Sequence, residues 1–210
     1  MIDDPVFCGL AVIFTFIFLL SVGSFFKIIP SLGDCVMRWK GNLDLEDSLQ
    51  LSGSRNWMVM VLFVPLCMVV YSHGLYQPDY MESLPPALGL AATCGTMLAY
   101  LVLRSFLNWQ LEMGAYRTKT FTAANHAFFN YIIILFLIVF PVGAILNISV
   151  GNKELTRVVL LHVIAVTYLF HIFRRGQIFA SACNPFTTFL YLCGLELIPT
   201  TALVLSAKLL

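Results

Sequence analysis

Six long apolar runs, separated by short polar segments, dominate the chain. They cover residues 5–26, 57–75, 85–103, 127–148, 157–173 and 186–206. A bilayer core about 30 Å thick is crossed by roughly 20 helical residues, whereas an open strand cannot cross it, because lipid leaves backbone groups without hydrogen-bond partners. The pattern therefore predicts an all-α polytopic transmembrane helical bundle of about six spans, formed by residues 1–210 as one domain.

The longest polar segment, residues 27–56, is predicted to be a cytoplasmic loop. Its glycines and mixed charges are typical of a solvated or interfacial linker. As an alternative, the leucines within residues 43–51 could form a short amphipathic contact with a cytoplasmic partner. Two variants of the topology stay open, because either this stretch or the short fifth run can lie in the membrane interface instead of crossing it.

Composition and charge placement support a membrane protein and orient it. Hydrophobic residues make up 60% of the chain and charged residues 11%, whereas soluble domains carry about 25% charged residues. The net charge of +1 provides no broad basic face for nucleic acid. Because cytoplasmic loops retain Lys and Arg, both termini are predicted to lie outside. Nine of the 12 basic residues then face the cytoplasm, namely Lys27, Arg38, Lys40, Arg55, Arg104, Arg117, Lys119, Arg174 and Arg175.

Glu196 stands near the middle of the last apolar run without a charged neighbour in sequence. Ionisable residues at that depth are costly and usually face the bundle or a wet cavity. Cys193 and Thr200 share its helix face, because they lie three and four residues away. With Asn130 and His162 from other spans, they form a candidate intramembrane polar site for a small solute, a lipid or a proton. The alternative is a neutral glutamic acid that only specifies helix packing.

A second candidate site lies at the cytoplasmic ends of the fourth and fifth runs. It comprises His126, His171, Arg174 and Arg175. Antiparallel neighbours would bring His126 and His171 to one depth, as a pair of axial ligands to b-type haem requires. No cofactor is the main expectation, with haem b as the alternative. With Arg104, Arg117 and Lys119, the two arginines would also suit a lipid phosphate, although setting the topology is a sufficient role for them.

The third run carries small residues at every fourth position, at Ala87, Ala91, Gly95 and Ala99. Such a face lets helix backbones approach closely in lipid. We predict that it packs against another helix of the bundle, with a contact to another membrane protein or a second copy as the alternative.

Several kinds of chemistry find no support in the sequence. The six cysteines form no CxxC or zinc-finger spacing, and no HExxH, GxSxG or phosphate-loop motif is present. We assign no catalytic residue and no metal ligand, and a role other than catalysis is favoured.

The run from Phe189 to Pro199 contains the pattern YLCxLExxP, and the chain closes on Lys208-Leu-Leu. This run resembles the closing motif of an uncharacterised bacterial family of polytopic inner-membrane proteins, a domain of unknown function. The resemblance covers the sequence from about residue 87 onward. It implies a multi-pass location in the bacterial inner membrane, and it transfers no substrate or catalytic residue.

Three functions follow from these patterns. The first is a bundle that binds or moves a small solute, lipid or proton, which predicts an internal polar cavity. The second is a non-catalytic assembly or scaffold subunit, which predicts a dry core and an exposed groove. The third is a b-type haem protein or a lipid-modifying enzyme. The expected partners are the lipid bilayer and another membrane protein or a second copy of the chain.

Overall fold

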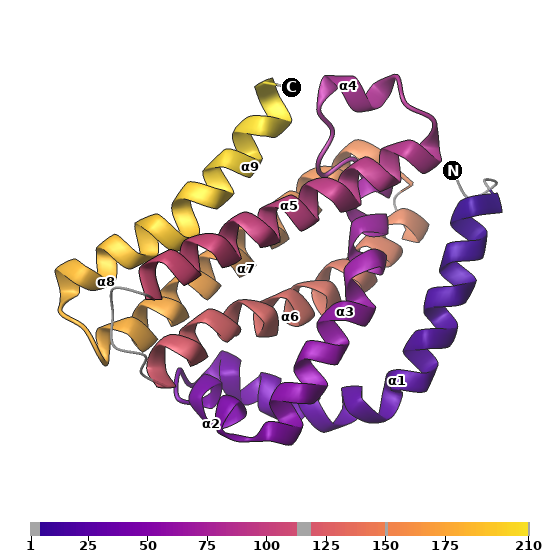
Figure 1. The fold of residues 1–210 in the computed structure, drawn as a ribbon. Coiled ribbons are helices and arrows are strands. Elements are labelled where there is room, and N and C mark those ends of the chain that lie inside the picture. The colour runs from indigo at the N-terminus through magenta and orange to yellow at the C-terminus, as the bar shows by residue number, and fades with distance from the viewer. Residues whose placement is uncertain (1–4, 113–118, 150, 210) are drawn as a thin grey trace.

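The computed structural model describes residues 5–112, 119–149 and 151–209. All of the regular elements in these ranges are helices (Figure 1). The long helices are α1 (Pro5–Met37), α3 (Leu49–Ser72), α5 (Pro86–Glu112), α6 (Lys119–Ser149) and α7 (Lys153–Ala180). The last span consists of α8 (Pro185–Leu192), a π-helical turn η1 (Cys193–Leu197) and α9 (Ile198–Leu209), while α2 (Gly41–Asp47) and α4 (Asp79–Glu82) are short. No strand occurs in the described ranges.

Six helical segments of the described chain are long and apolar enough to cross a membrane. The predicted all-α, multi-pass bundle of about six spans is therefore confirmed. Figure 1 shows both ends of the chain at the same end of the bundle, as an even number of spans requires. That these ends face outside stays a prediction from the distribution of basic residues.

The first span is longer than predicted, because α1 continues past Lys27 to Met37. Ile28, Leu32 and Cys35 follow one another at helical spacing and are buried, while Lys27 is exposed. The prediction ended the first span at its first charge, Lys27. That charge lies on the outward side of the helix, however, and the inner side stays apolar as far as Cys35, so the helix continues. The prediction of a linker over residues 27–56 is therefore corrected. These residues form the end of α1, the whole of α2 and the start of α3.

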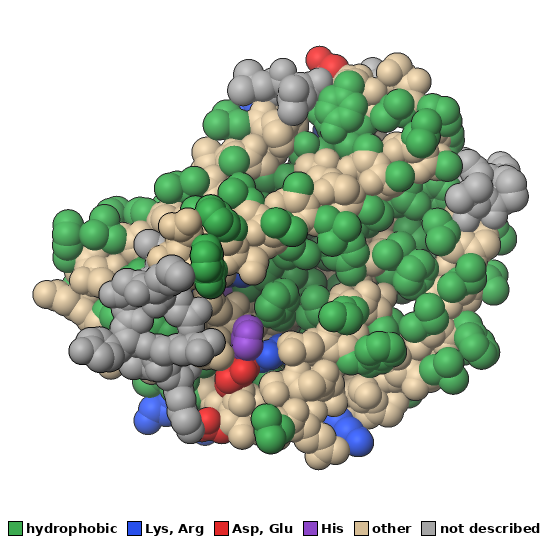
Figure 2. Space-filling view, viewed as in Figure 1, with side chains coloured by type: hydrophobic (Ala, Val, Ile, Leu, Met, Phe, Trp, Pro, Cys, Tyr) green, Lys and Arg blue, Asp and Glu red, His purple; other side chains and the backbone are tan. Residues whose placement is uncertain are grey.

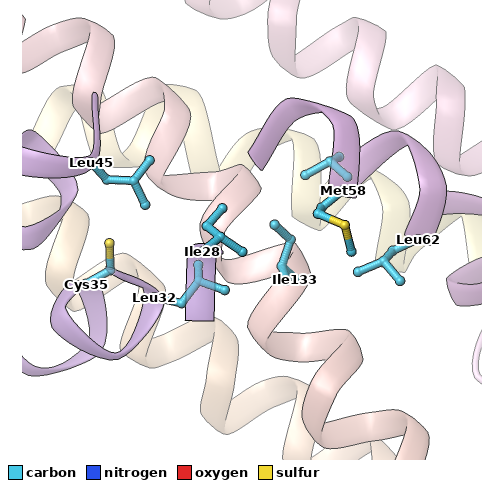
Figure 3. Packing of buried hydrophobic residues seen from close by; sticks show 8 residues of the cluster. Ile28, Leu32, Cys35, Leu45, Met58, Leu62 and Ile133 are labelled. Atoms are coloured by element: carbon cyan, nitrogen blue, oxygen red, sulfur yellow. The ribbon is translucent and has the colours of Figure 1, made fainter. Parts of the chain in front are cut away.

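The short helix α2 is part of the core rather than a solvated segment. Leu45 of α2 is buried in a cluster with Ile28, Met58 and Ile133, which joins α1, α2, α3 and α6 (Figure 3). Gly41 begins α2 directly against the end of α1, where a Cβ atom would lie 2.6 Å from the backbone carbonyl carbon of Asp34. The start of α2 thus depends on the absence of a side chain at this position. Whether a cytoplasmic partner contacts residues 43–51 stays open.

The small-residue face of α5 lies on the outside of the bundle. Ala87, Ala91, Gly95 and Ala99 are all exposed. The helix packs instead through another face, where Leu90 and Thr93 are buried. Gly89 is on this face, and a Cβ atom there would lie 2.6 Å from the ring of Tyr71 in α3. The predicted seam against another helix of this chain is therefore wrong, because α5 uses larger residues and Gly89 for its contacts within the chain.

The last span contains a wide turn at Cys193–Leu197. Pro199 has no N–H group, so the carbonyl of Leu195 lacks its usual helical donor. The backbone widens here, and the N–H of Ile198 donates to the carbonyl of Cys193, five residues earlier. Such π-turns are short and occur inside longer helices, often at functional sites. This one carries Glu196.

Candidate functional site

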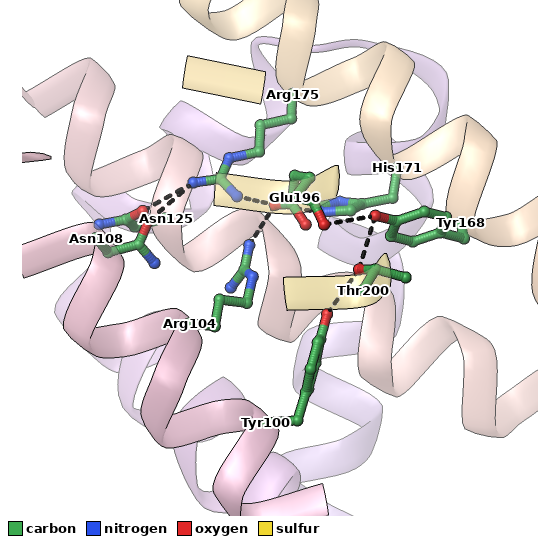
Figure 4. Close-up of polar contacts among 9 residues, drawn as sticks. All are labelled: Tyr100, Arg104, Asn108, Asn125, Tyr168, His171, Arg175, Glu196 and Thr200. Carbon is green, nitrogen blue, oxygen red and sulfur yellow. Dashed lines mark hydrogen bonds and ion pairs between the residues drawn. The ribbon is translucent and has the colours of Figure 1, made fainter. Parts of the chain in front are cut away.

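A cluster of ionisable side chains is buried between α5, α7 and the last span (Figure 4). It comprises Arg104 from α5, His171 and Arg175 from α7, and Glu196 from η1, and we call it the Glu196 cluster. Each of the four residues is at most 3% exposed. His171 and Arg175 are four residues apart on α7, so that they share one helix face. Three segments far apart in the sequence thus meet at one carboxyl group.

One oxygen of Glu196 receives all of the cluster's direct contacts. Arg104 donates from Nη2 to Glu196 Oε1 over 2.5 Å, and His171 Nε2 lies 3.2 Å from the same oxygen. Arg175 forms an ion pair with it through Nη1. The other oxygen, Oε2, is buried and has no hydrogen-bond partner among the described residues. The carboxylate therefore holds two guanidinium groups and still has acceptor capacity on its second oxygen.

The charges in the cluster do not balance. Two guanidinium groups face a single carboxylate, so at least one positive charge is in excess even when the imidazole is neutral. Buried charges are expensive unless they are paired, and intramembrane ionisable residues usually mark a functional site. The excess makes this part of the bundle attractive to an anion.

The two arginines have different surroundings. Arg175 is held by side-chain amides, because its Nη2 donates to Asn125 Oδ1 over 2.9 Å and to Asn108 Oδ1 over 3.3 Å. Arg104 lies with its guanidinium 3.6 Å from the ring centre of Phe128, a cation–π contact. Its Nε has no hydrogen-bond partner in the described parts of the chain. Arg175 is therefore tied by amide groups to α5 and α6, and both arginines keep an Nε donor without a hydrogen-bond partner among the described residues.

Hydroxyl groups continue the network beyond Glu196. The hydroxyl of Tyr168 lies 3.0 Å from the backbone carbonyl oxygen of Glu196 and 2.8 Å from Thr200 Oγ1. Tyr100 Oη lies 3.3 Å from the same threonine oxygen. The carbonyl at the π-turn thus finds a side-chain donor, and α5, α7 and α9 are joined at this level.

A cavity of about 260 Å³ lies between α5 and α6, with Arg104 in its wall. Its polar lining residues are Arg104, Ser105, Asn108, Asn125 and His126. Its apolar lining residues are Leu101, Trp109, Phe128 and Phe129. Figure 2 shows this side of the molecule hollowed, with basic, acidic and histidine side chains gathered at one edge of the hollow and hydrophobic side chains around it. Arg104 thus joins the Glu196 cluster to a space that can hold a small ligand.

A second charged group lies behind His126, which is part of the cavity wall. Glu46 of α2 accepts a hydrogen bond from Arg55 over 2.6 Å, and its other oxygen lies 2.8 Å from His126 Nδ1. This group links α2 to α3 and α6. Burial raises the pKa of the Glu46 carboxyl, but the hydrogen bonds and charges of His126 and Arg55 together outweigh burial and lower it from 4.5 to about 2.

The lowered pKa of Glu46 predicts a loss of stability in acid. The ionised carboxyl is more favourable in the folded state than in the unfolded state. Its contribution to the free energy of unfolding is therefore complete above about pH 4.5 and is lost as the pH falls towards 2. Unfolding midpoints measured in detergent from pH 6 to pH 2.5 should fall more steeply for the wild type than for Glu46→Gln. Parallel curves for the two proteins would contradict this contribution.

The structure brings together some of the predicted site residues. Glu196, Thr200, His171 and Arg175 belong to one network. His126 reaches the cavity but not that network, because its Nδ1 is bound to Glu46. His126 and His171 thus have separate carboxylate partners, and their predicted pairing as haem ligands stays without support from these contacts.

The other predicted residues serve elsewhere. Asn130 donates to Asn42 Oδ1 over 2.9 Å and so ties α6 to α2. His162 is exposed and bonds the carbonyl of Val158 within its own helix, while Cys193 lines a shallow apolar groove on the last span. Their inclusion in one site with Glu196 is corrected, because they lie on other helix faces.

Arg174 caps a helix rather than facing the cavity. Its Nη2 donates to the carbonyl oxygens of Val36 and Met37 over 2.6 and 3.0 Å. These carbonyls end α1 and have no helical partner of their own. Arg174 is therefore separate from Arg175 in function, although the two are adjacent in sequence. Arg117 of the predicted basic pocket lies outside the described residues.

Comparison with protein-family models, with curated protein sequences and with solved structures finds no match to this chain. The resemblance of residues 189–199 to a bacterial membrane-protein family therefore stays a prediction.

Proposed function

We propose that this membrane protein binds a small anionic group in the cavity between α5 and α6. The observation that carries the proposal is the excess positive charge of the Glu196 cluster at the wall of that cavity. Arg104 is the contact residue, because it pairs with Glu196 and also lines the cavity. Ser105, Asn108 and Asn125 add hydroxyl and amide groups to the same wall.

The arrangement suits binding better than proton transfer by Glu196. The hypothesis of a proton carrier rested on a carboxyl group isolated in an apolar span, whereas Glu196 has two guanidinium partners. An incoming phosphate or carboxylate would share Arg104 with Glu196, and Arg175 would keep its amide and carboxylate contacts. Guanidinium groups are well suited to such anions, because their N–H donors match two oxygens at once.

Inorganic phosphate tests the proposal. A ligand that binds only the folded state raises its stability by RT ln(1 + [L]/Kd). At constant ionic strength, replacing chloride with phosphate should raise the unfolding midpoint of the purified wild type and leave that of Arg104→Gln unchanged. Loss of Arg104 leaves Arg175 and Glu196 as a one-to-one pair, so this variant should still fold.

Two further variants complete the test. Ser105→Leu fills part of the cavity without touching the Glu196 cluster and should also abolish the phosphate effect. Arg38→Gln removes an exposed arginine that pairs with Asp34 on α1 and should retain the phosphate effect. If phosphate raised the unfolding midpoint equally in the wild type and all three variants, or in none of the four proteins, the proposal would be overturned.

A second candidate function is that of a subunit in a membrane assembly. It is favoured by the exposed small-residue face of α5, at Ala87, Ala91, Gly95 and Ala99, because such faces let helices of different chains approach closely. The two functions are separable, since Arg104→Gln would leave an assembly through this face intact.

A further inference from the structure

The cavity opens on the flank of the bundle. α5 packs mainly against α3, η1 and α9, whereas α6 packs against α2, α3 and α7. The space between α5 and α6 is therefore not closed by helix packing among the described residues. Figure 2 shows the hollow on the side of the molecule, with hydrophobic side chains along part of its rim and charged and histidine side chains at one edge. A ligand reaches such an opening from within the bilayer as well as from water.

The lining of the cavity has a polar and an apolar part. Arg104 of α5 and Asn125 of α6 offer donors, while Leu101 and Phe129 line the cavity about one helical turn further along the same two helices. Leu98 continues the face of Leu101 one turn towards the membrane centre and is 50% exposed. A molecule with a charged head and an apolar chain would meet a matching surface at both ends.

The depth of the cavity fits the headgroup region. Trp109 lines it, is 54% exposed and lies close to the predicted cytoplasmic end of α5. Exposed tryptophans are enriched at the membrane interface. Arg104 precedes Trp109 by five residues, which places it about 7.5 Å deeper along the helix. A phosphate at the interface thus lies within reach of the guanidinium of Arg104.

The volume limits what enters. At about 260 Å³, the cavity is smaller than the roughly 300–1,000 Å³ pockets that enclose drug-sized ligands. It accommodates a headgroup or a small anion, but an acyl chain would have to stay outside, along the exposed apolar side of α5.

We infer that the occupant is the phosphate-bearing headgroup of an anionic membrane lipid, which enters sideways between α5 and α6 and is held by Arg104. The inference rests on the proposed anion site and names its ligand class. The phosphodiester would accept from Arg104 and from the Asn125 amide, while one acyl chain would lie against Leu101 and Leu98. A soluble phosphate shares the first contact and lacks the second.

Three probes separate the sources of the phosphate. The delipidated full-length protein in a non-ionic detergent is titrated separately with phosphatidylglycerol, with phosphatidylcholine of the same acyl chains, and with glycerol 3-phosphate. The unfolding midpoint is measured at each step, and bound lipid is counted by native mass spectrometry. We expect phosphatidylglycerol to bind at least tenfold more tightly than either other probe. Arg104→Gln and Ser105→Leu should each lose that preference, and Arg38→Gln should keep it.

Each outcome decides one of the two proposals. Equal stabilisation by glycerol 3-phosphate and phosphatidylglycerol, lost in Arg104→Gln, would overturn the lipid inference and leave the anion site standing. Binding of phosphatidylglycerol that is unchanged in both cavity variants would also overturn it, since it would reflect lipid around the bundle. No Arg104-dependent effect of any phosphate probe would remove the lipid inference and the proposed function together.

Discussion

Replacing Glu196 with glutamine is expected to lower the free energy of unfolding by about 3–5 kcal/mol, because it leaves two buried guanidinium groups without their carboxylate. The side chain keeps its size, so the loss reports charge rather than packing. Both arginines are at most 3% exposed. Denaturant unfolding in detergent micelles measures the effect.

A double variant tests whether the charge imbalance causes this loss of stability. Glu196→Gln with Arg175→Gln carries one buried positive charge fewer than Glu196→Gln alone, so it should regain part of the lost stability. Glu154→Gln is the matched control, because Glu154 is exposed in the first turn of α7 and its loss should stay below about 1 kcal/mol. Similar losses at positions 154 and 196 would contradict an ion-paired role for Glu196.

Adding one methyl group at Gly41 is expected to destabilise the protein by about 1–3 kcal/mol, a typical cost of overpacking. The new Cβ would meet the carbonyl carbon and oxygen of Asp34 at 2.6 Å and the nitrogen of Cys35 at 2.8 Å. All three are backbone atoms of α1, so no side chain can swing aside. The end of α1 and the start of α2 would have to separate.

The same substitution at Gly53 should have the opposite sign. Gly53 is inside α3, is exposed, and a Cβ there would meet nothing within 4 Å. Alanine is favoured over glycine in a helix interior by roughly 0.5–1 kcal/mol, so Gly53→Ala should stabilise. Unfolding midpoints of the two variants measured side by side check both signs. Two losses of equal size would show that the Gly41 contact is not the cause.

The helical bundle was predictable because each span is a local property of the sequence. Twenty apolar residues in a row require a helix in lipid, whatever the remainder of the chain does. The ends of the spans were less predictable, since a charge such as Lys27 stops an apolar run but not a helix whose other face is buried. The third apolar run likewise ends before Arg104, whereas α5 continues to Glu112, because Arg104 is buried and paired with Glu196 from another span.

The candidate site was predictable only in part. Glu196 stood out because it is a lone acid in an apolar run, and His171 and Arg175 because they close the fifth run. Their meeting with Arg104 depends on how three spans pack, and no spacing within the sequence encodes that contact. The roles of Arg174 and Arg175 differ for the same reason, since adjacent helical residues point in directions about 100° apart.

The order of the Glu196 cluster along the chain has a consequence for biosynthesis. A chain is made from its N-terminus, so Arg104 and Arg175 enter the membrane before the carboxylate that pairs with them exists. Until the last span is inserted, both guanidinium groups lack the carboxylate that pairs with them in the folded chain. A chain shortened before residue 196 would keep both arginines without their counter-charge and would be a substrate for membrane quality control.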